Sequence, residues 1–313
     1  MIRFLASRFL RGLLTLFLVL SFAFVILRST GDPAMLIMSA DAPPEALEAF
    51  RKGWGLDAPL WQQYVGYFKN LLQGNFGYSM RDKSPAMDLV LARIPATLTL
   101  AIPALAIKLL IGIPAGVFAA LHRNTWIDRL LIGLSIAGYT MPSFVLGLVL
   151  VLIFAVGLGW LPSGGDATWQ HAILPVVALS LGGAAVLARF TRSAMLEVMG
   201  QPYIRTASAK GLVWQRVVLD HAMPNAAIPT LTVIGFMVGS LIAGAVVVES
   251  VFSWPGVGRL LVTSVANRDL AVVQSLLLLV ATTMVSANLL VDALYGWIDP
   301  RVRSGQAVPG KNQ

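Results

Sequence analysis

The stretch ATLTLAIPALAIKLLIGIPAGVFAAL, Ala96–Leu121, decides the fold class of this chain. Its 26 residues contain one charged side chain, Lys108. A helix needs about 20 mostly apolar residues to cross the hydrocarbon core of a bilayer. This stretch is long and apolar enough to do so, and it therefore predicts a transmembrane helix.

Five further apolar stretches are long enough to span a membrane. They are Phe9–Leu27, Leu130–Leu158, Ala172–Ala188, Ile228–Val248 and Val272–Tyr295. The first follows basic residues, as a signal peptide does, but the sequence after it contains no small-x-small cleavage pattern. We therefore expect an all-α integral membrane protein with six transmembrane helices, the first of which (residues 1–28) is retained.

The composition supports a membrane protein and excludes other classes. The chain has 313 residues, of which 57% are hydrophobic and 12% charged, about half the ~25% charge of a soluble domain. It contains no cysteine and three histidines, which excludes disulfides and thiolate metal sites and leaves little room for a histidine-ligated metal. We attribute the net charge of +8 to the basic residues that orient membrane proteins, and expect no nucleic-acid binding.

The distribution of basic residues predicts that both termini face the cytoplasm (N-in/C-in). Short outer loops then contain only Arg259 and Arg268, and the outer segment 29–93 is too long for the positive-inside rule to apply. The cytoplasmic segments contain Arg3, Arg8, Arg11, Arg123, Arg129, Arg189, Arg192, Arg205, Lys210, Arg216, Arg301, Arg303 and Lys311.

Small residues and prolines within the spans indicate a tightly packed bundle. Pairs of glycines four residues apart let helix backbones approach closely, and we expect this packing to occur within the chain. Prolines inside spans need neighbouring helices to satisfy the freed carbonyls. These residues are Gly112 and Gly116, Gly235 and Gly239, and Pro103, Pro114, Pro142 and Pro175.

Lys108 is the candidate residue of a translocation path. A lone lysine near the middle of a span costs at least ~2.5 kcal/mol on insertion scales, so it should face water or find a partner. The alternative is a lysine beside a cavity or subunit interface with no role in transport. The spans contain no series of buried acids, which argues against an ion-coupled secondary transporter, the alternative from a different class.

Two helices are predicted in the outer segment, and a turn in the last outer loop. Pro43–Lys52 has helix-start residues before its basic end, and Leu60–Gln73 has aromatic residues spaced as in an interfacial helix. The segment could dock an extracytoplasmic partner or form a packed cap without a ligand. Phe252–Leu260 contains the turn signal Trp254-Pro255-Gly256. We expect it to form a re-entrant or surface-lying turn at the outer face that does not span the membrane; the alternative is an ordinary loop.

The longest cytoplasmic loop, Met195–Ala227, predicts two short amphipathic helices. Pro202 suits a first helical turn, and Tyr203, Ile204 and Ala207 are spaced to share one face that ends at Gly211. Trp214–Met223 would form the second helix, ended by Pro224. Such a knob could fit a groove on another protein or lie on lipid. In the first case the small Ala207 would allow close approach.

The sequence YIRTASAKGL, Tyr203–Leu212, resembles the cytoplasmic signature of binding-protein-dependent ABC importer permeases in its peptide/nickel form, the oligopeptide/dipeptide permease B type. Arg205-Thr206-Ala207 stands in the place of Glu-Ala-Ala, and Gly211 is the matching glycine; the missing Glu departs from the general consensus. The resemblance extends from the first span to Arg303 through Gly31-Asp32-Pro33-Ala34, Gly74–Ser79 (GNFGYS), Phe252–Leu260 (FSWPGVGRL) and Asp299-Pro300-Arg301.

The resemblance implies a type I ABC importer permease fold in the bacterial cytoplasmic (inner) membrane. It divides the chain into an N-terminal helix (1–28), an extracytoplasmic segment (29–93), a permease domain (94–299) and a cytoplasmic tail (300–313). The 195–227 loop would couple the chain to its ATPases. The residues carried over for that role are Tyr203, Arg205, Thr206, Ala207, Lys210, Gly211 and Leu212.

The resemblance also implies the partners and the substrate class. A second permease would complete the path as a heterodimer in the lipid membrane, two cytoplasmic ATPases would bind ATP and Mg²⁺, and a periplasmic binding protein would deliver a short peptide. Relatives also carry nickel complexes, glutathione and other small solutes. The chain has no Gly-x4-Gly-Lys-Ser/Thr motif, so we expect a non-catalytic subunit without a cofactor of its own.

Overall fold

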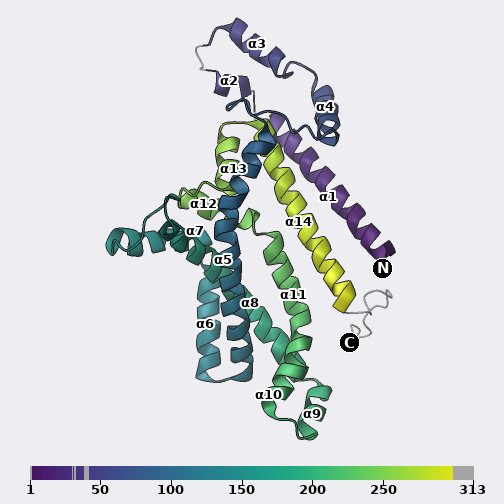
Figure 1. Ribbon diagram of the computed structural model, residues 1–313, viewed down its shortest axis with the longest axis vertical. Coiled ribbons are helices and arrows are strands. Elements are labelled where there is room, and N and C mark those ends of the chain that lie inside the picture. The colour runs from purple at the N-terminus through teal and green to yellow at the C-terminus, as the bar shows by residue number, and fades with distance from the viewer. Residues whose placement is uncertain (1, 30, 32, 39–41, 299–313) are drawn as a thin grey trace.

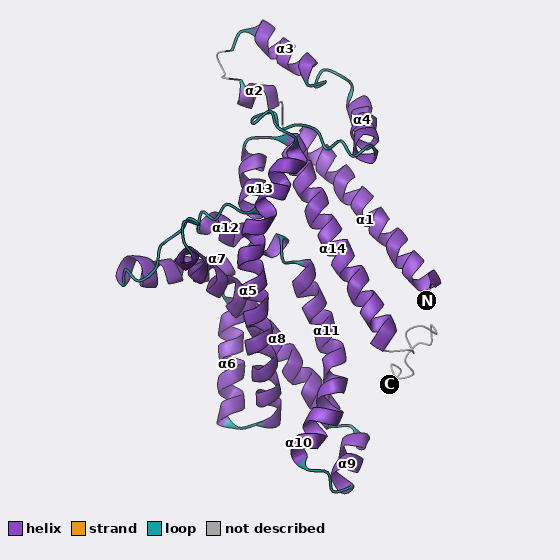
Figure 2. Cartoon of the chain, viewed as in Figure 1, coloured by secondary structure: helices purple, strands orange, loops and turns teal. Residues whose placement is uncertain are grey.

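The structure is a computed structural model that describes residues 2–29, 31, 33–38 and 42–298. In this part of the chain all regular structure is helical (Figure 2). The predicted tail 300–313 and the motif Asp299-Pro300-Arg301 lie outside the described residues, as does Asp32. The predicted all-α class is confirmed.

The helices are labelled in Figure 1 in chain order. The α-helices are α1 (Ile2–Ser29), α2 (Pro33–Ile37), α3 (Pro44–Gly53), α4 (Leu60–Leu72), α5 (Ala86–Leu121), α6 (Trp126–Thr140), α7 (Ser143–Leu150), α8 (Ile173–Met199), α9 (Pro202–Ala209), α10 (Trp214–Arg216), α11 (Met223–Gly239), α12 (Val246–Val251), α13 (Val257–Ala266) and α14 (Leu270–Ile298). Two π-helical turns span Val151–Gly157 and Val217–Ala222, and two 3₁₀ turns span Trp169–Ala172 and Ala243–Ala245.

Five helical segments are long and apolar enough to cross a membrane, and six if the bent pair described below counts as one. The five are Ala6–Ser29, Ala86–Leu121, Trp169–Met199, Trp214–Gly239 and Leu270–Val291. Each overlaps one predicted span. α5 begins at Ala86, so it continues through the predicted boundary at 93/94.

The third predicted span, Leu130–Leu158, is not one straight helix. α6 ends at Thr140, and the helical pair Trp126–Thr140 and Ser143–Gly157 is bent by 97°. Met141 between them is extended, with φ −81° and ψ 118°, and Pro142 precedes α7. A proline disfavours helical geometry in the residue before it. If the pair counts as one span, the predicted span is present in a broken form, and Pro142 lies at the break and not within a helix.

The fifth predicted span, Ile228–Val248, also ends elsewhere. α11 ends at Gly239, and a 3₁₀ turn leads into the separate short helix α12. The apolar sequence continues through this break, so hydropathy alone did not show where the helix stops.

Glycine contacts fix how closely the spans pack. A Cβ added to Gly116 of α5 would lie 2.4 Å from the carbonyl oxygen of Ala188 in α8, and one added to Gly112 would lie 2.8 Å from that of Ala184. A Cβ on Gly235 of α11 would lie 2.1 Å from Val291 Cγ2 in α14. The expectation that these glycines serve packing within the chain is confirmed.

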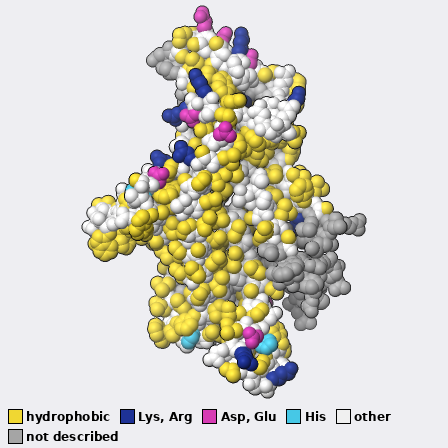
Figure 3. Space-filling view, viewed as in Figure 1, with side chains coloured by type: hydrophobic (Ala, Val, Ile, Leu, Met, Phe, Trp, Pro, Cys, Tyr) yellow, Lys and Arg dark blue, Asp and Glu magenta, His cyan; other side chains and the backbone are white. Residues whose placement is uncertain are grey.

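The arrangement separates two polar ends from an apolar middle. The predicted outer segment, α2–α4, lies at the upper end of Figure 1 near α13, whereas α9, α10 and the α5–α6 turn lie at the lower end. α1 begins and α14 ends in the lower half. Figure 3 shows charged side chains gathered at the two ends and a hydrophobic surface between them. This grouping is the one that an N-in/C-in topology requires.

Candidate functional site

The first half of the 195–227 loop has the predicted local geometry. Pro202 lies in the first turn of α9, and the N–H of Lys210 donates to the carbonyl of Thr206 at 3.1 Å. Gly211 follows with φ +78°. A residue with a Cβ adopts this conformation only at a cost of about 1 kcal/mol or more. The predicted helix start and glycine stop are both confirmed.

The second half of the loop differs from the prediction. α10 passes through the π-helical turn Val217–Ala222 into α11, and Pro224 lies in the first turn of α11. Pro224 thus does not end the helix. A π-helical turn moves backbone hydrogen bonds from four to five residues back, and so accommodates a proline that would clash in a regular α-helix. The loop is therefore continuous with the spanning helix Trp214–Gly239.

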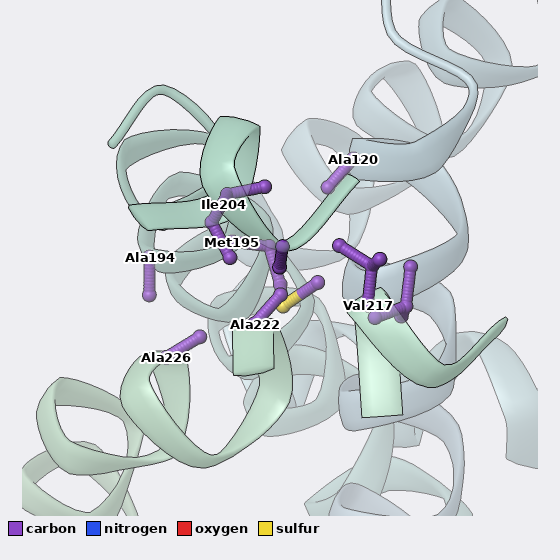
Figure 4. Packing of buried hydrophobic residues seen from close by; sticks show 9 residues of the cluster. Ala120, Ala194, Met195, Ile204, Val217, Ala222 and Ala226 are labelled. Atoms are coloured by element: carbon purple, nitrogen blue, oxygen red, sulfur yellow. The ribbon is translucent and has the colours of Figure 1, made fainter. Parts of the chain in front are cut away.

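A hydrophobic core holds α9 against the ends of the spans (Figure 4). Met195 of α8, Val217 and Ala222 are fully buried, and Ile204 and Ala207 of α9 are 3% and 7% exposed. The remaining members of this cluster are Ala120, Ala194, Val218 and Ala226. The knob therefore brings together side chains from α5, α8, α9 and α11, and α9 cannot move independently of these spans without losing this packing.

The buried position of Ala207 corrects one expectation. Ala207 and Ile204 are three residues apart and face inward together, so the small side chain makes room for the chain's own core. Tyr203 does not share their burial, because 43% of its surface is exposed. The amphipathic pattern correctly predicted a helix with one apolar face. We expected that face to meet a partner, but it packs on the chain's own core.

The outward surface of the knob combines basic and apolar side chains. Arg205, Thr206, Lys210 and Gly211 are exposed. Tyr203 and three more large apolar side chains, Val213, Trp214 and Leu219, are also exposed. Leu212 is half-buried and packs against the core cluster. Six of the seven predicted coupling residues are therefore at least partly accessible, and Ala207 is not.

An ion pair fixes the base of this end of the molecule. Arg192 of α8 donates two hydrogen bonds to Asp128 of α6, Nε to Oδ1 at 2.7 Å and Nη2 to Oδ2 at 2.8 Å. The backbone N–H of Asn124 donates to the same carboxylate at 3.0 Å. Asp128 is 3% exposed. Bidentate pairs fix orientation as well as distance, so the start of α6 is held against α8 next to the knob.

Lys108 lies at the contact between α5 and α8. Its aliphatic stem packs over Gly183, where an added Cβ would lie 2.6 Å from Lys108 Cε. The side chain is half-buried. Among residues 2–29, 31, 33–38 and 42–298, no carboxylate lies within ion-pair distance of it. Its assignment to a translocation path stays a prediction.

The predicted outer turn is built around a buried carboxylate. Glu249 is fully buried and accepts hydrogen bonds from Thr97 Oγ1 at 2.6 Å and from the N–H groups of Gly258 and Arg259 at 2.8 and 3.0 Å. Trp254 Nε1 donates to the carbonyl of Ala96 at 2.7 Å. Residues 252–260 form a turn and the first turn of α13, which has ten residues. At ten residues α13 is too short to span a bilayer, and the location of this segment at the outer face stays a prediction.

A second buried carboxylate ties the outer segment to the spans. Ser79 Oγ donates to Asp269 Oδ2, and the backbone N–H of Met80 donates to Oδ1 at 3.4 Å. Ser79 is fully buried, and Asp269 immediately precedes α14. The GNFGYS stretch is thereby anchored to the start of the last span.

The aromatic side chains of α4 contact α1. Tyr64 packs edge-on against Phe24 with ring centroids 5.4 Å apart, and its hydroxyl hydrogen-bonds Ser21 Oγ at 2.8 Å. Phe68 lies 5.3 Å from Phe17. Trp61 stays 66% exposed. Part of the aromatic face predicted for the membrane interface is thus used to pack the outer segment onto the first span.

The described residues contain no group of three or more His, Asp or Glu side chains placed to hold a metal ion. The candidate functional features discussed above are the knob, Lys108 and the outer segment.

Family models match nearly the whole chain. A model described as "Binding-protein-dependent transport system inner membrane component" matches residues 112–304, and its N-terminal companion matches residues 1–101. The chain belongs to this family. Members of the family are permease subunits of ABC importers, and this permease is a multi-pass protein of the bacterial inner membrane.

Curated relatives match the permease over their full length. The glutathione transport system permease protein GsiC of Escherichia coli strain K12 is 42% identical over 304 residues, covering 97% of this chain and 99% of the relative. GsiC of Shigella dysenteriae serotype 1 gives the same values. A crystal structure of an amino acid ABC transporter with histidines is 20% identical with a TM-score of 0.49, covering 68% of this chain and 94% of that one.

Several residues that organise the permease carry no sequence signal of their own. The pairs Asp128–Arg192, Thr97–Glu249 and Ser79–Asp269 are 64, 152 and 190 residues apart. Their roles depend on which helices meet. Glu249 could have been suspected only because it is a charged residue directly after an apolar stretch.

Proposed function

We propose that this permease forms half of the translocation path for short peptides delivered by a periplasmic binding protein. A second permease completes the path as a heterodimer. Two cytoplasmic ATPases bind the 195–227 loop and supply ATP, Mg²⁺ and hydrolysis. The chain itself is non-catalytic and binds no cofactor.

The observation that carries the proposal is the construction of the knob. Its outward surface presents Arg205 and Lys210 beside exposed Tyr203 and Trp214, a mixture suited to a protein groove. Its inward surface packs on Met195 of α8, and its second half continues into α11. A displacement of the knob by a bound ATPase is therefore transmitted to two spans.

Two observations support the assignment of a peptide substrate, one from the relatives and one from the signature sequence. Glutathione, named in the relatives, is a tripeptide, and the signature sequence Tyr203–Leu212 is of the peptide-permease type. Short peptides with a free carboxylate are the common class. Within that class, glutathione is the first substrate to test.

The test uses the complete transporter reconstituted in proteoliposomes with its binding protein. We expect uptake of glutathione or trialanine only when ATP is present on the ATPase side. The double variant Arg205→Glu/Lys210→Glu should lose ATPase co-purification and uptake, because it reverses the charge of the outward surface. Lys69→Glu, an exposed lysine of α4, is the matched control and should behave as wild type.

Uptake by this chain without ATP or ATPases would contradict the proposal and favour an ion-coupled carrier. Full co-purification of the ATPases with the double variant would show that they bind elsewhere.

A further inference from the structure

A cavity of about 560 Å³ lies between the outer end of α1, helix α4 and the start of α14. Its wall includes Arg28 from α1, Gln63 and Tyr67 from α4, and Gln274 from α14. These elements meet at the upper end of Figure 1. Sites for small molecules usually have volumes of about 300–1,000 Å³, so the cavity is large enough for one.

Two buried polar atoms on this wall have no hydrogen-bond partner among the described residues, and they are complementary. Arg28 Nε is a donor and Gln63 Oε1 is an acceptor. The orientation of the Gln63 amide is fixed because its Nε2 donates to the carbonyls of Leu56 at 3.2 Å and Ala58 at 2.6 Å. Buried polar groups are normally paired, and each one left without a partner costs stability. Neither atom is exposed to the cavity, so they mark its wall as incompletely paired and do not themselves contact a ligand.

The electrostatics of the cavity favour an anion. Arg28 is the only charged side chain among the described lining residues. Its guanidinium carbon lies 5.6 Å from the centre of the Phe24 ring, which holds it in place by a cation–π contact. Burial raises the pKa of Tyr67 to about 12, so its phenol stays protonated at neutral pH and adds no negative charge.

We infer that this cavity binds the carboxylate end of a short peptide at the outer face of the permease. Arg28 binds the carboxylate through the charge of its guanidinium. The side-chain amides of Gln62 and Gln274 also line the cavity and match peptide groups as donors and acceptors. The identity of the ligand rests on the proposed function, because peptides are the proposed cargo.

A cysteine-protection experiment tests the site without requiring transport. The chain contains no cysteine, and Gly66 lines the cavity with no atom within 4 Å of an added Cβ. Gly66→Cys should therefore react with an impermeant maleimide in membranes that contain the complete transporter. Leu72→Cys, on the same helix and outside the cavity at a residue 87% exposed, is the matched control.

We expect millimolar trialanine to slow labelling of Gly66→Cys several-fold, and trialanine amide to do so only at concentrations at least tenfold higher. Labelling of Leu72→Cys should not change. Adding Arg28→Gln should abolish the difference between the two peptides and leave the labelling rate without peptide unchanged. Arg28→Lys should retain part of the difference, because it keeps the charge.

Two outcomes would overturn the inference. The first is equal protection by trialanine and its amide, or none by either. The second is protection by glycerol 3-phosphate but not by trialanine, which would assign the cavity to a lipid headgroup. Protection with no ATP-dependent peptide uptake would refute the proposed function and retain a carboxylate site. Uptake without protection would support the proposed function and refute the carboxylate site.

Discussion

Replacing Glu249 tests whether the buried carboxylate determines the structure of the outer turn. Oε1 accepts one hydrogen bond from Thr97, and Oε2 accepts two from the N–H groups of Gly258 and Arg259. A Cβ added to Gly256 would lie 2.3 Å from the Glu249 carboxyl carbon, so the turn is shaped closely around this group. Glu249→Ala removes the acceptor for all three donors and leaves a void in a fully buried position.

The size of the effect follows from the number of donors. A buried donor left without its partner costs about 1–3 kcal/mol, so three donors give about 3 kcal/mol at the low end, before the cost of the void. Glu249→Gln should cost much less, roughly 1 kcal/mol. Its amide oxygen can accept from both N–H groups, and its NH₂ can donate to Thr97 Oγ1, which already accepts from the N–H of Val257 at 2.8 Å.

Thermal unfolding of the purified transporter, followed beside peptide uptake, measures this difference. We expect a small decrease in Tm for Glu249→Gln and a much larger one for Glu249→Ala, with uptake lost in the second. Equal Tm values for the two variants would refute the reasoning, because it assigns stability to the acceptor oxygens. A larger loss for Gln than for Ala would also refute it, because it would show that the buried NH₂ group finds no acceptor beside Thr97.

Three further predictions concern the knob and the packing of the spans. Ile204→Ala removes a buried side chain at a cost of about 2–5 kcal/mol, so it should speed hydrogen exchange throughout residues 195–227, whereas Tyr203→Ala should lower ATPase co-purification and leave exchange unchanged. Gly116→Leu should prevent accumulation in the membrane, measured by immunoblotting, because its Cβ would lie 2.4 Å from a carbonyl oxygen of α8; normal levels would contradict the helix contact. Asp128→Asn should lower Tm by an amount equivalent to about 1.5–3 kcal/mol, because it weakens the two charge-assisted hydrogen bonds from the partly buried Arg192, and an unchanged Tm would contradict a structural role for the pair.

Local features of the sequence predicted local features of the structure. Pro202 and Gly211 lie where a helix start and a left-handed stop were expected, because each residue restricts its own backbone. Helices α3 and α4 begin and end within a residue or two of the predicted positions for the same reason. The break at Met141–Pro142 was missed because hydropathy does not change there, although the proline itself was the available signal.

The candidate site was only partly predictable. The segment Tyr203–Leu212 was singled out correctly as a helix with a glycine stop, but periodicity cannot say whether an apolar face meets a partner or the chain's own core. Ala207 meets the chain's own core because α8 and the π-helical turn before α11 bring Met195 and Ala222 into the same cluster. Nothing in the sequence of the loop contains that information.

The sequence by itself determined that the protein resides in a membrane and that it is all-α. Within lipid, an apolar stretch of 20 or more residues is stable as a helix, because a helix satisfies its own backbone hydrogen bonds. Glycine and proline influence the backbone conformation wherever they occur. Only the tertiary structure decided which polar groups meet. Thr97 and Glu249 lie 152 residues apart, and Arg28 and Gln63 face one cavity from different helices. Such groups find partners only when helices pack, because contact between them is a property of the assembled bundle.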